Sequence, residues 1–273
     1  MSNEPTSTVR PRFLLLLGWT RHSLFLLSGF LLTIGLIVYI WWPLAEDVLS
    51  AIDWSGPWWL YFDWLLVGIF LFMSLTIVAH ADLRTDGWLI LVGTFGGLVI
   101  ESWGTQTNLW TYYTDERPPL WIIPAWPIAS LSIDRITRLL LWVTRKVAPS
   151  EQRLPGMFEF LYWCIFLSFL ALMLVFVSPT FDKPYTLLAT FLVVFLILTP
   201  NDKRTSVLTF LAGAGLGYFL ELWGTTRQCW TYYTHQTPPL FAVLAHGMAA
   251  VAFWRANVAL QAVLVRMRLL RSA

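Results

Sequence analysis

The sequence predicts an all-α polytopic membrane protein with about eight transmembrane helices in two parallel four-helix repeats. Of its 273 residues, 57% are hydrophobic and 12% are charged, whereas soluble domains carry about 25% charged residues. Several apolar runs approach the roughly 20 residues that cross a hydrocarbon core. Residues 81–120 and 201–240 share 18 identities across 40 positions, which indicates an internal repeat.

Eight apolar runs are candidates for transmembrane helices. The first follows Arg10, Arg12 and Arg21, as in a signal peptide, but no small-residue cleavage site follows it, which favours a retained helix. The third, sixth and seventh runs are short and would stand upright or thin the bilayer locally. The predicted spans are residues 23–42, 58–79, 87–103, 120–143, 157–178, 184–200, 206–223 and 240–265.

The Lys and Arg residues predict the orientation of these spans. With the N-terminus inside, the inner segments hold twelve of them, and the outer loops hold only Arg117, Lys183 and Arg227. Because cytoplasmic loops are enriched in Lys and Arg, we expect both termini in the cytoplasm and the chain in the cell membrane, with the lipid bilayer as a partner. The net charge of +2 is too small to indicate nucleic acid as a partner.

The repeat divides the chain into two membrane units. A shift of 120 residues superposes Glu101 on Glu221, together with the Trp-Gly-Thr, Trp-Thr-Tyr-Tyr-Thr and Pro-Pro-Leu segments nearby. Four spans per unit is an even number, so both units would share one orientation about an axis along the membrane normal. The predicted parts are a cytoplasmic N-terminal segment (1–22), unit 1 (23–143), a cytoplasmic linker (144–156), unit 2 (157–265) and a basic cytoplasmic tail (266–273).

Each unit places a glutamate at the end of a glycine stripe. Gly97 lies four residues before Glu101, and Gly217 lies four residues before Glu221. A stripe of small residues lets another helix or a flat ligand approach, so each glutamate should face the interior, where an ionisable residue indicates a functional site. If the stripes meet at the axis, one carboxyl group would keep its proton and serve as a proton donor. Alternatively, each carboxylate reaches interfacial water or loop amides.

Aromatic residues cluster around both glutamates in the sequence. They fit an aromatic belt at the membrane interface, although a belt does not require a fixed spacing to a Glu and a Gly. They could instead stabilise a carbocation through their π faces or line a pocket for an apolar chain. The candidate binding residues are Trp103, Trp110, Tyr112, Tyr113, Trp126, Trp223, Trp230, Tyr232 and Tyr233, with Gly97 and Gly217 beside them.

Two further residues are candidates for catalysis. His246 stands in unit 2 where unit 1 has Trp126, and it lies about 9 Å beyond Leu240 at 1.5 Å per residue, near the level of the glutamates. This difference favours one asymmetric site over two equal ones, although a lone His on an apolar face is commonly a packing residue. Asp63 enters from the outer end of the second helix and has no acidic counterpart.

At the inner face, two arginines and two aspartates match across the units. Arg135 with Asp82, and Arg255 with Asp202, are predicted to form structural ion pairs, because buried charges are tolerated when they are paired. No HExxH, CxxC, P-loop or GxSxG motif occurs, so the sequence predicts no metal site and no cofactor.

A recurring pattern consists of Glu-x-x-Gly, then an aromatic-x-Tyr, then Pro, with a further Pro on the next helix. It resembles the integral-membrane carotenoid-biosynthesis proteins, chiefly the carotenoid 1,2-hydratases, and more distantly the lycopene cyclases built from repeated membrane units. The cyclases' Pro-x-Glu-Glu signature is absent, since the segment Pro-Ala-Trp-Pro carries no acid. The matching residues are Glu101, Gly104, Trp110, Tyr112, Pro119, Pro124 and Trp126, then Glu221, Gly224, Trp230, Tyr232 and Pro239.

The resemblance implies a cofactor-independent enzyme that acts on a long apolar isoprenoid or carotenoid-like lipid. A carboxylic acid would protonate an alkene, and aromatic rings would shelter the cation. Water or an internal double bond would then quench it, which describes a hydratase or a cyclase. Two other classes stay open: a transporter, because parallel repeats occur in transporters, and a non-catalytic lipid- or pigment-binding subunit of a membrane complex.

Overall fold

The computed structural model describes residues 18–147 and 156–272, and most of them are helical. Parts of the predicted N-terminal segment (1–17), linker (148–155) and tail (Ala273) lie outside the described residues. The helices are α2 (Ser23–Ile40), α3 (Trp42–Ser50), α4 (Trp64–Val78), α5 (Leu83–Gln106), α6 (Ala125–Val147), α7 (Met157–Val177), α8 (Pro184–Leu198), α9 (Lys203–Thr226) and α10 (Leu240–Ser272), and the strands are β1 (Trp110–Tyr112) and β2 (Trp230–Tyr232).

Five helices are long and apolar enough to cross a membrane: α2, α5, α7, α9 and α10. Helices α4 and α8 are equally apolar but shorter, and α6 carries polar residues along one side. Each of the eight predicted runs overlaps one of these helices. The sequence analysis missed α3, a short helix that begins at Trp42, the last residue of the first predicted span. The predicted helical, membrane-type character is confirmed.

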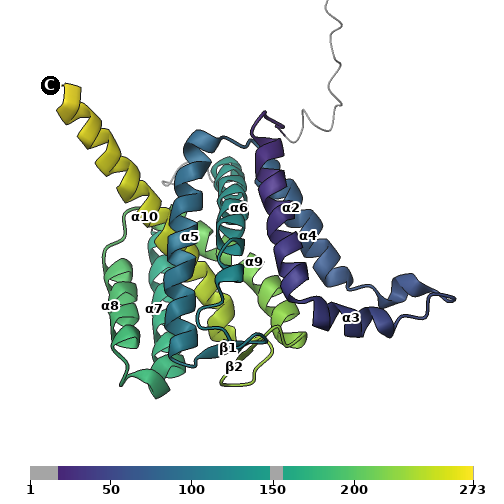
Figure 1. Cartoon of the computed structure of the whole chain (residues 1–273). Helices are drawn as coiled ribbons and strands as arrows, with labels where there is room; N and C mark the ends of the chain where they lie inside the picture. Colours follow the sequence, from purple (N-terminus) through teal and green to yellow (C-terminus); the bar gives the residue numbers. More distant parts are fainter. Residues whose placement is uncertain (1–17, 148–155, 273) are drawn as a thin grey trace, which may run out of the picture.

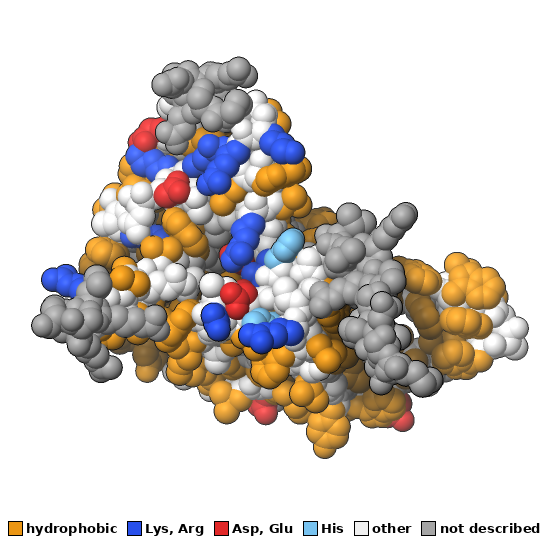
Figure 2. Space-filling view, turned by 90° about the horizontal axis from the view of Figure 1, so that it is seen from above, with side chains coloured by type: hydrophobic (Ala, Val, Ile, Leu, Met, Phe, Trp, Pro, Cys, Tyr) orange, Lys and Arg blue, Asp and Glu red, His pale blue; other side chains and the backbone are white. Residues whose placement is uncertain are grey.

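Helices α5, α6, α9 and α10 lie at the centre of the molecule. On one side, α4 packs against α6 and α9, and α2 packs against α4 (Figure 1). On the other side, α7 packs against α9 and α10, and α8 packs against α7. The two strands lie at one end, which we name the strand end, and the C-terminal part of α10 lies toward the opposite end (Figure 1). Figure 2, which looks onto that opposite end, shows Lys and Arg side chains gathered there.

Arg135 pairs with Asp86 and not with Asp82, the partner that was predicted. Asp82 is the N-cap of α5 and accepts a hydrogen bond from the backbone N–H of Arg84 at 3.1 Å. Arg135 pairs with Asp86 at 2.7 Å, and both side chains are buried. The predicted Arg135–Asp82 pair is therefore wrong, because Asp82 binds the free N–H groups of the helix end and Asp86 meets the guanidinium one turn further in.

The predicted Arg255–Asp202 pair is also wrong. Asp202 is the N-cap of α9 and accepts a hydrogen bond from the backbone N–H of Thr205 at 3.0 Å. Position 206, which corresponds to Asp86, is a serine, so Arg255 has no acid at that place. Its guanidinium instead donates to the carbonyl of Leu196 at 2.5 Å, at the C-terminal end of α8, where the helix dipole favours a cation.

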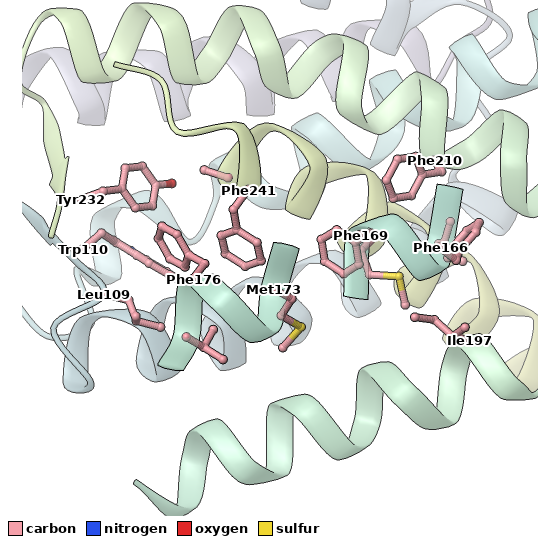
Figure 3. Close-up of a cluster of buried hydrophobic side chains, with 14 of the residues drawn as sticks. Leu109, Trp110, Phe166, Phe169, Met173, Phe176, Ile197, Phe210, Tyr232 and Phe241 are labelled. Atoms are coloured by element: carbon pink, nitrogen blue, oxygen red, sulfur yellow. The ribbon is translucent and has the colours of Figure 1, made fainter. Parts of the chain in front are cut away.

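The largest buried cluster joins α7, α9 and α10 to the strand end. Figure 3 shows Phe169 and Phe176 of α7 beside Phe241 of α10, with the Phe176 and Phe241 rings stacked at 4.2 Å between centroids. Tyr232 of β2 meets Phe176 edge-on at 6.0 Å. Packing between aromatic rings adds to the energy of their burial, and it holds the second strand against α7.

Candidate functional site

The two Trp-Thr-Tyr segments, far apart in the sequence, pair with each other. Strands β1 and β2 are antiparallel, with Trp110 opposite Tyr232 and Tyr112 opposite Trp230. Each opposed pair of rings lies within 6 Å between centroids, at 5.8 and 5.9 Å respectively. Because each strand follows shortly after α5 or α9, this pairing brings the ends of the two helices, and their glutamates, to one place.

Glu101 is buried, with 3% of its surface exposed, and it accepts three hydrogen bonds. Its Oε2 accepts one from the indole N–H of Trp110 at 3.1 Å. Its Oε1 accepts one from the Tyr112 hydroxyl at 2.8 Å and one from the indole N–H of Trp126 at 3.1 Å. This glutamate therefore faces the interior of the protein.

Glu221 is buried to the same extent and has matching partners. Its Oε2 accepts a hydrogen bond from the indole N–H of Trp230 at 2.9 Å, and its Oε1 accepts one from the Tyr232 hydroxyl at 2.9 Å. His246 Nε2 lies 2.8 Å from the same Oε1. Relative to each glutamate the three partners stand 9, 11 and 25 residues later, so both halves hold their carboxyl group in the interior by the same spacing.

The third partner is the one difference between the two sets. Trp126 serves Glu101, and His246 serves Glu221. Their rings stack on one another, with centroids 5.9 Å apart and planes 18° apart. The two carboxyl groups are thus joined through an indole and an imidazole in contact, which supports one asymmetric site.

Burial keeps the two tyrosines of this site protonated. Burial raises the pKa of Tyr112 and of Tyr232 well above the usual range, and the nearby glutamate charges act in the same direction. Both phenols therefore serve as hydrogen-bond donors to the carboxyl groups.

The glycine stripes receive the side chains of the next helix. A Cβ on Gly97 would lie 2.3 Å from the indole of Trp126, and one on Gly217 would lie 2.5 Å from the Cβ of His246. The two stripes therefore do not meet each other, and these glycines do not line the cavity. Each glycine makes room for the ring that holds its neighbouring glutamate, and its role in ligand binding stays a prediction.

Substituting one of these glycines should separate this packing role from a general effect on the helix. Gly217→Ala forces His246 to move, and overpacking of this kind costs about 1–3 kcal/mol. Gly215 on the same helix has open space within 4 Å of the position that a Cβ would occupy, so Gly215→Ala should be neutral or stabilising by up to ~1 kcal/mol. Thermal unfolding in detergent micelles measures both. Equal stability of the two variants would contradict the role assigned to Gly217.

A cavity of about 850 Å³ lies beside the two glutamates, and its wall is mostly apolar. Leu188 and Leu192 of α8 and Val99 of α5 belong to this wall and are also 45–64% exposed. The cavity is therefore open sideways between α5 and α8. Of the candidate residues, those that line it are Glu101, Trp103, Trp110, Tyr112, Trp126, Glu221, Trp230, Tyr232 and His246.

Four other candidates, Asp63, Trp223, Tyr113 and Tyr233, do not line the cavity. Asp63 caps α4 and accepts hydrogen bonds from Trp223 at 2.8 Å and Arg227 at 3.0 Å. Burial opposes ionisation of Asp63, but hydrogen bonds from Leu66, Arg227 and Trp223 lower its pKa overall. Asp63 thus binds these donors at the helix end and does not line the cavity, and its catalytic role stays a prediction.

The adjacent tyrosines also point elsewhere. The Tyr233 hydroxyl donates to the carbonyl of Phe176 at 2.6 Å, and Tyr113 is 44% exposed. Neither lines the cavity, and their role in substrate binding stays a prediction. Successive side chains of a strand point to opposite faces, and therefore Tyr112 and Tyr232 face the glutamates while their neighbours do not.

Several lining residues escaped the sequence analysis. Most of them are apolar and they come from both halves, for example Leu98 and Val99 of α5 and Leu188 and Leu192 of α8, on helices where most positions are apolar. Such helices carry no pattern that separates a cavity wall from a lipid-facing surface. The largest of these side chains are Phe169, Met173, Tyr185, Phe241 and Phe253.

Among residues 18–147 and 156–272, no group of three or more His, Cys, Asp or Glu is arranged to hold a metal ion. Comparisons with protein families, with curated proteins and with solved structures find no match for this chain.

Proposed function

We propose that this chain is a membrane-embedded, cofactor-independent enzyme that protonates an alkene of a long apolar isoprenoid. One observation supports this above all: two buried carboxyl groups, ringed by aromatic side chains, belong to the wall of a single apolar cavity of about 850 Å³. Cavities of roughly 300–1,000 Å³ with few polar groups are typical of small-molecule sites. A buried acid in an apolar cavity suits proton transfer to a substrate that has no polar group of its own.

We further propose that eight helices cross the cell membrane as two parallel units, with both termini in the cytoplasm. The gathering of Lys and Arg side chains at the end opposite the strand end supports this orientation (Figure 2). The two strands and the two glutamates would then lie toward the outer face. Several exposed aromatic side chains lie in the segment between α3 and α4, such as Trp54, Trp58 and Trp59, as expected at a membrane interface.

The sideways opening favours a substrate that resides in the bilayer. Lining residues on α8 run from Tyr185 to Leu196, a rise of roughly 16 Å at 1.5 Å per residue. An extended hydrocarbon chain could therefore enter between α5 and α8 from the lipid, without passing through water, and lie along the helices with one end near the carboxyl groups.

The chemistry requires no electron donor or acceptor. The π electrons of the alkene form a C–H bond with the acidic proton, and the O–H or N–H bond of the acid breaks. The resulting tertiary carbocation is stabilised by the remaining carboxylate and by aromatic π faces. Hydration then forms a C–O bond from water, which returns a proton to the site. In cyclisation an internal double bond attacks and a neighbouring C–H bond releases the proton.

Incubation in D₂O tests this function directly. Membranes containing the chain are mixed with a panel of linear polyprenes and polyenes, and products are analysed by mass spectrometry. We expect deuterium on carbon in a product that is either an isomer of the substrate or has gained one water. Binding without deuterium incorporation would indicate a lipid- or pigment-binding subunit, and uptake of a solute into sealed vesicles without deuterium incorporation would indicate a transporter; either result would overturn the enzyme proposal.

A further inference from the structure

The two halves of the site differ in which atoms can hold a proton. The partners of Glu101 are two indoles and a phenol. An indole N–H donates and never accepts, and Tyr112 keeps its proton because burial raises its pKa. A proton on Glu101 would therefore face two indole N–H groups that can only donate, and the Tyr112 hydroxyl oxygen would be its sole acceptor among the three partners. This arrangement is satisfied when Glu101 is a carboxylate.

Glu221 differs through its contact with His246. A neutral imidazole has one nitrogen that donates and one that accepts. With a single proton between Nε2 and Oε1, the pair exists either as carboxylate with imidazolium or as carboxylic acid with neutral imidazole. Both forms fit the 2.8 Å contact between these atoms, so the proton can move without rearrangement of the side chains.

The cavity wall around this pair holds few other ionisable groups. Among the described residues that line the cavity, the ionisable ones are Glu101, Tyr112, Tyr185, Glu221, Tyr232 and His246. Lys, Arg and Asp are missing from that set, so Glu101 is the one other carboxyl group among the described residues that line the cavity. A nearby negative charge disfavours a second one. The indole of Trp126 also presents its face to the imidazole at 5.9 Å, within the range of a cation–π contact.

We propose that Glu221 and His246 together hold the transferable proton, and that Glu101 acts as the carboxylate that stabilises the carbocation. This division of roles rests on the proposed function. Both Glu221 and His246 line the cavity, so the proton can leave either atom toward the substrate. After transfer the pair consists of a carboxylate and a neutral imidazole. In hydration, this pair accepts the proton that the attacking water loses, and the site returns to its first state.

The exchange of the third partner tests this division. His246→Trp makes the second half like the first, where glycine already accommodates an indole beside a glutamate. We expect deuterium incorporation to fall about 10²–10⁴-fold, the usual contribution of a general acid, with the detergent-solubilised protein still folded. The double variant Trp126→His/His246→Trp should recover part of this loss and should then depend on Glu101 in place of Glu221. Full activity in His246→Trp would overturn the proposal.

A second measurement does not depend on activity. The chain has four histidines, so ¹⁵N labelling of histidine and comparison with His246→Gln assigns the His246 signals in the NMR spectrum. We expect Nε2 to show a proton shared with an acceptor, and this signature to change in Glu221→Gln but not in Glu46→Gln, whose site is exposed on α3.

These two measurements separate the possible failures. A shared proton without turnover of any isoprenoid would leave the Glu221–His246 pair standing but would refute the enzyme. Turnover that is unaffected by His246→Trp, together with a His246 signal that does not respond to Glu221→Gln, would leave the enzyme standing but would refute the division of roles.

Discussion

Glu221→Gln should lower the rate of deuterium incorporation about 10²–10⁴-fold, as expected for loss of a general acid. The amide oxygen can still accept hydrogen bonds from Tyr232 and His246, which both contact Oε1 in the wild type. The amide nitrogen, however, cannot carry an acidic proton. It also faces the indole N–H of Trp230, where two donors oppose each other at a cost of about 1–3 kcal/mol.

The measurement is single-turnover product formation in D₂O, with thermal unfolding of each variant recorded in the same detergent. Glu46→Gln is the matched control, because it makes the same chemical change at an exposed site. Glu101→Gln should also slow the reaction, since it removes the negative charge that faces the cation. If Glu101→Gln and Glu221→Gln both keep the wild-type rate while the proteins are folded, acid catalysis by this pair is wrong.

Ala249→Trp should remove most of the binding of a long apolar chain. Ala249 belongs to the cavity wall on α10, and an indole there would occupy space needed by the substrate. Displacement of about four methylene groups at ~0.8 kcal/mol each amounts to ~3 kcal/mol, or roughly a hundredfold in affinity. The affinity for a fluorescent polyene, titrated into the protein in lipid nanodiscs, gives the result.

Ala259→Trp is the matched control for this prediction. It lies ten residues further along α10 and is exposed, away from the cavity, so the same substitution should leave binding unchanged. Equal loss in both variants would point to a general effect on α10. Unchanged affinity in Ala249→Trp would show that the substrate does not use this cavity.

The aromatic residues show how one composition serves two purposes. Trp54, Trp58 and Trp59 are exposed in the segment between α3 and α4, which fits the belt interpretation. Trp110 and Trp230 instead donate to the two glutamates. Their fixed distance of nine residues from each glutamate was the signal that distinguished them, since a belt residue needs only the right depth in the membrane.

The tight packing of those indoles has a signal in the sequence. A Cβ on Gly104 would lie 1.8 Å from the ring of Trp110, and one on Gly224 would lie 2.0 Å from the ring of Trp230. The repeated Trp-Gly-Thr segment thus carries a structural requirement: glycine at this place lets an indole lie against the helix and reach the carboxyl group one turn earlier.

The sequence by itself determined the helical membrane-type character, the helix positions and the inward direction of Glu101 and Glu221, because apolar run length and residue spacing along one helix are local properties. It could not determine which element meets each helix face. Only the tertiary structure showed that Asp86 takes Arg135, that Asp63 binds Trp223 and Arg227, and that the glycine stripes hold Trp126 and His246. These partners come from distant parts of the chain, and their choice depends on how the helices pack and on the pairing of two short strands, which no local pattern encodes.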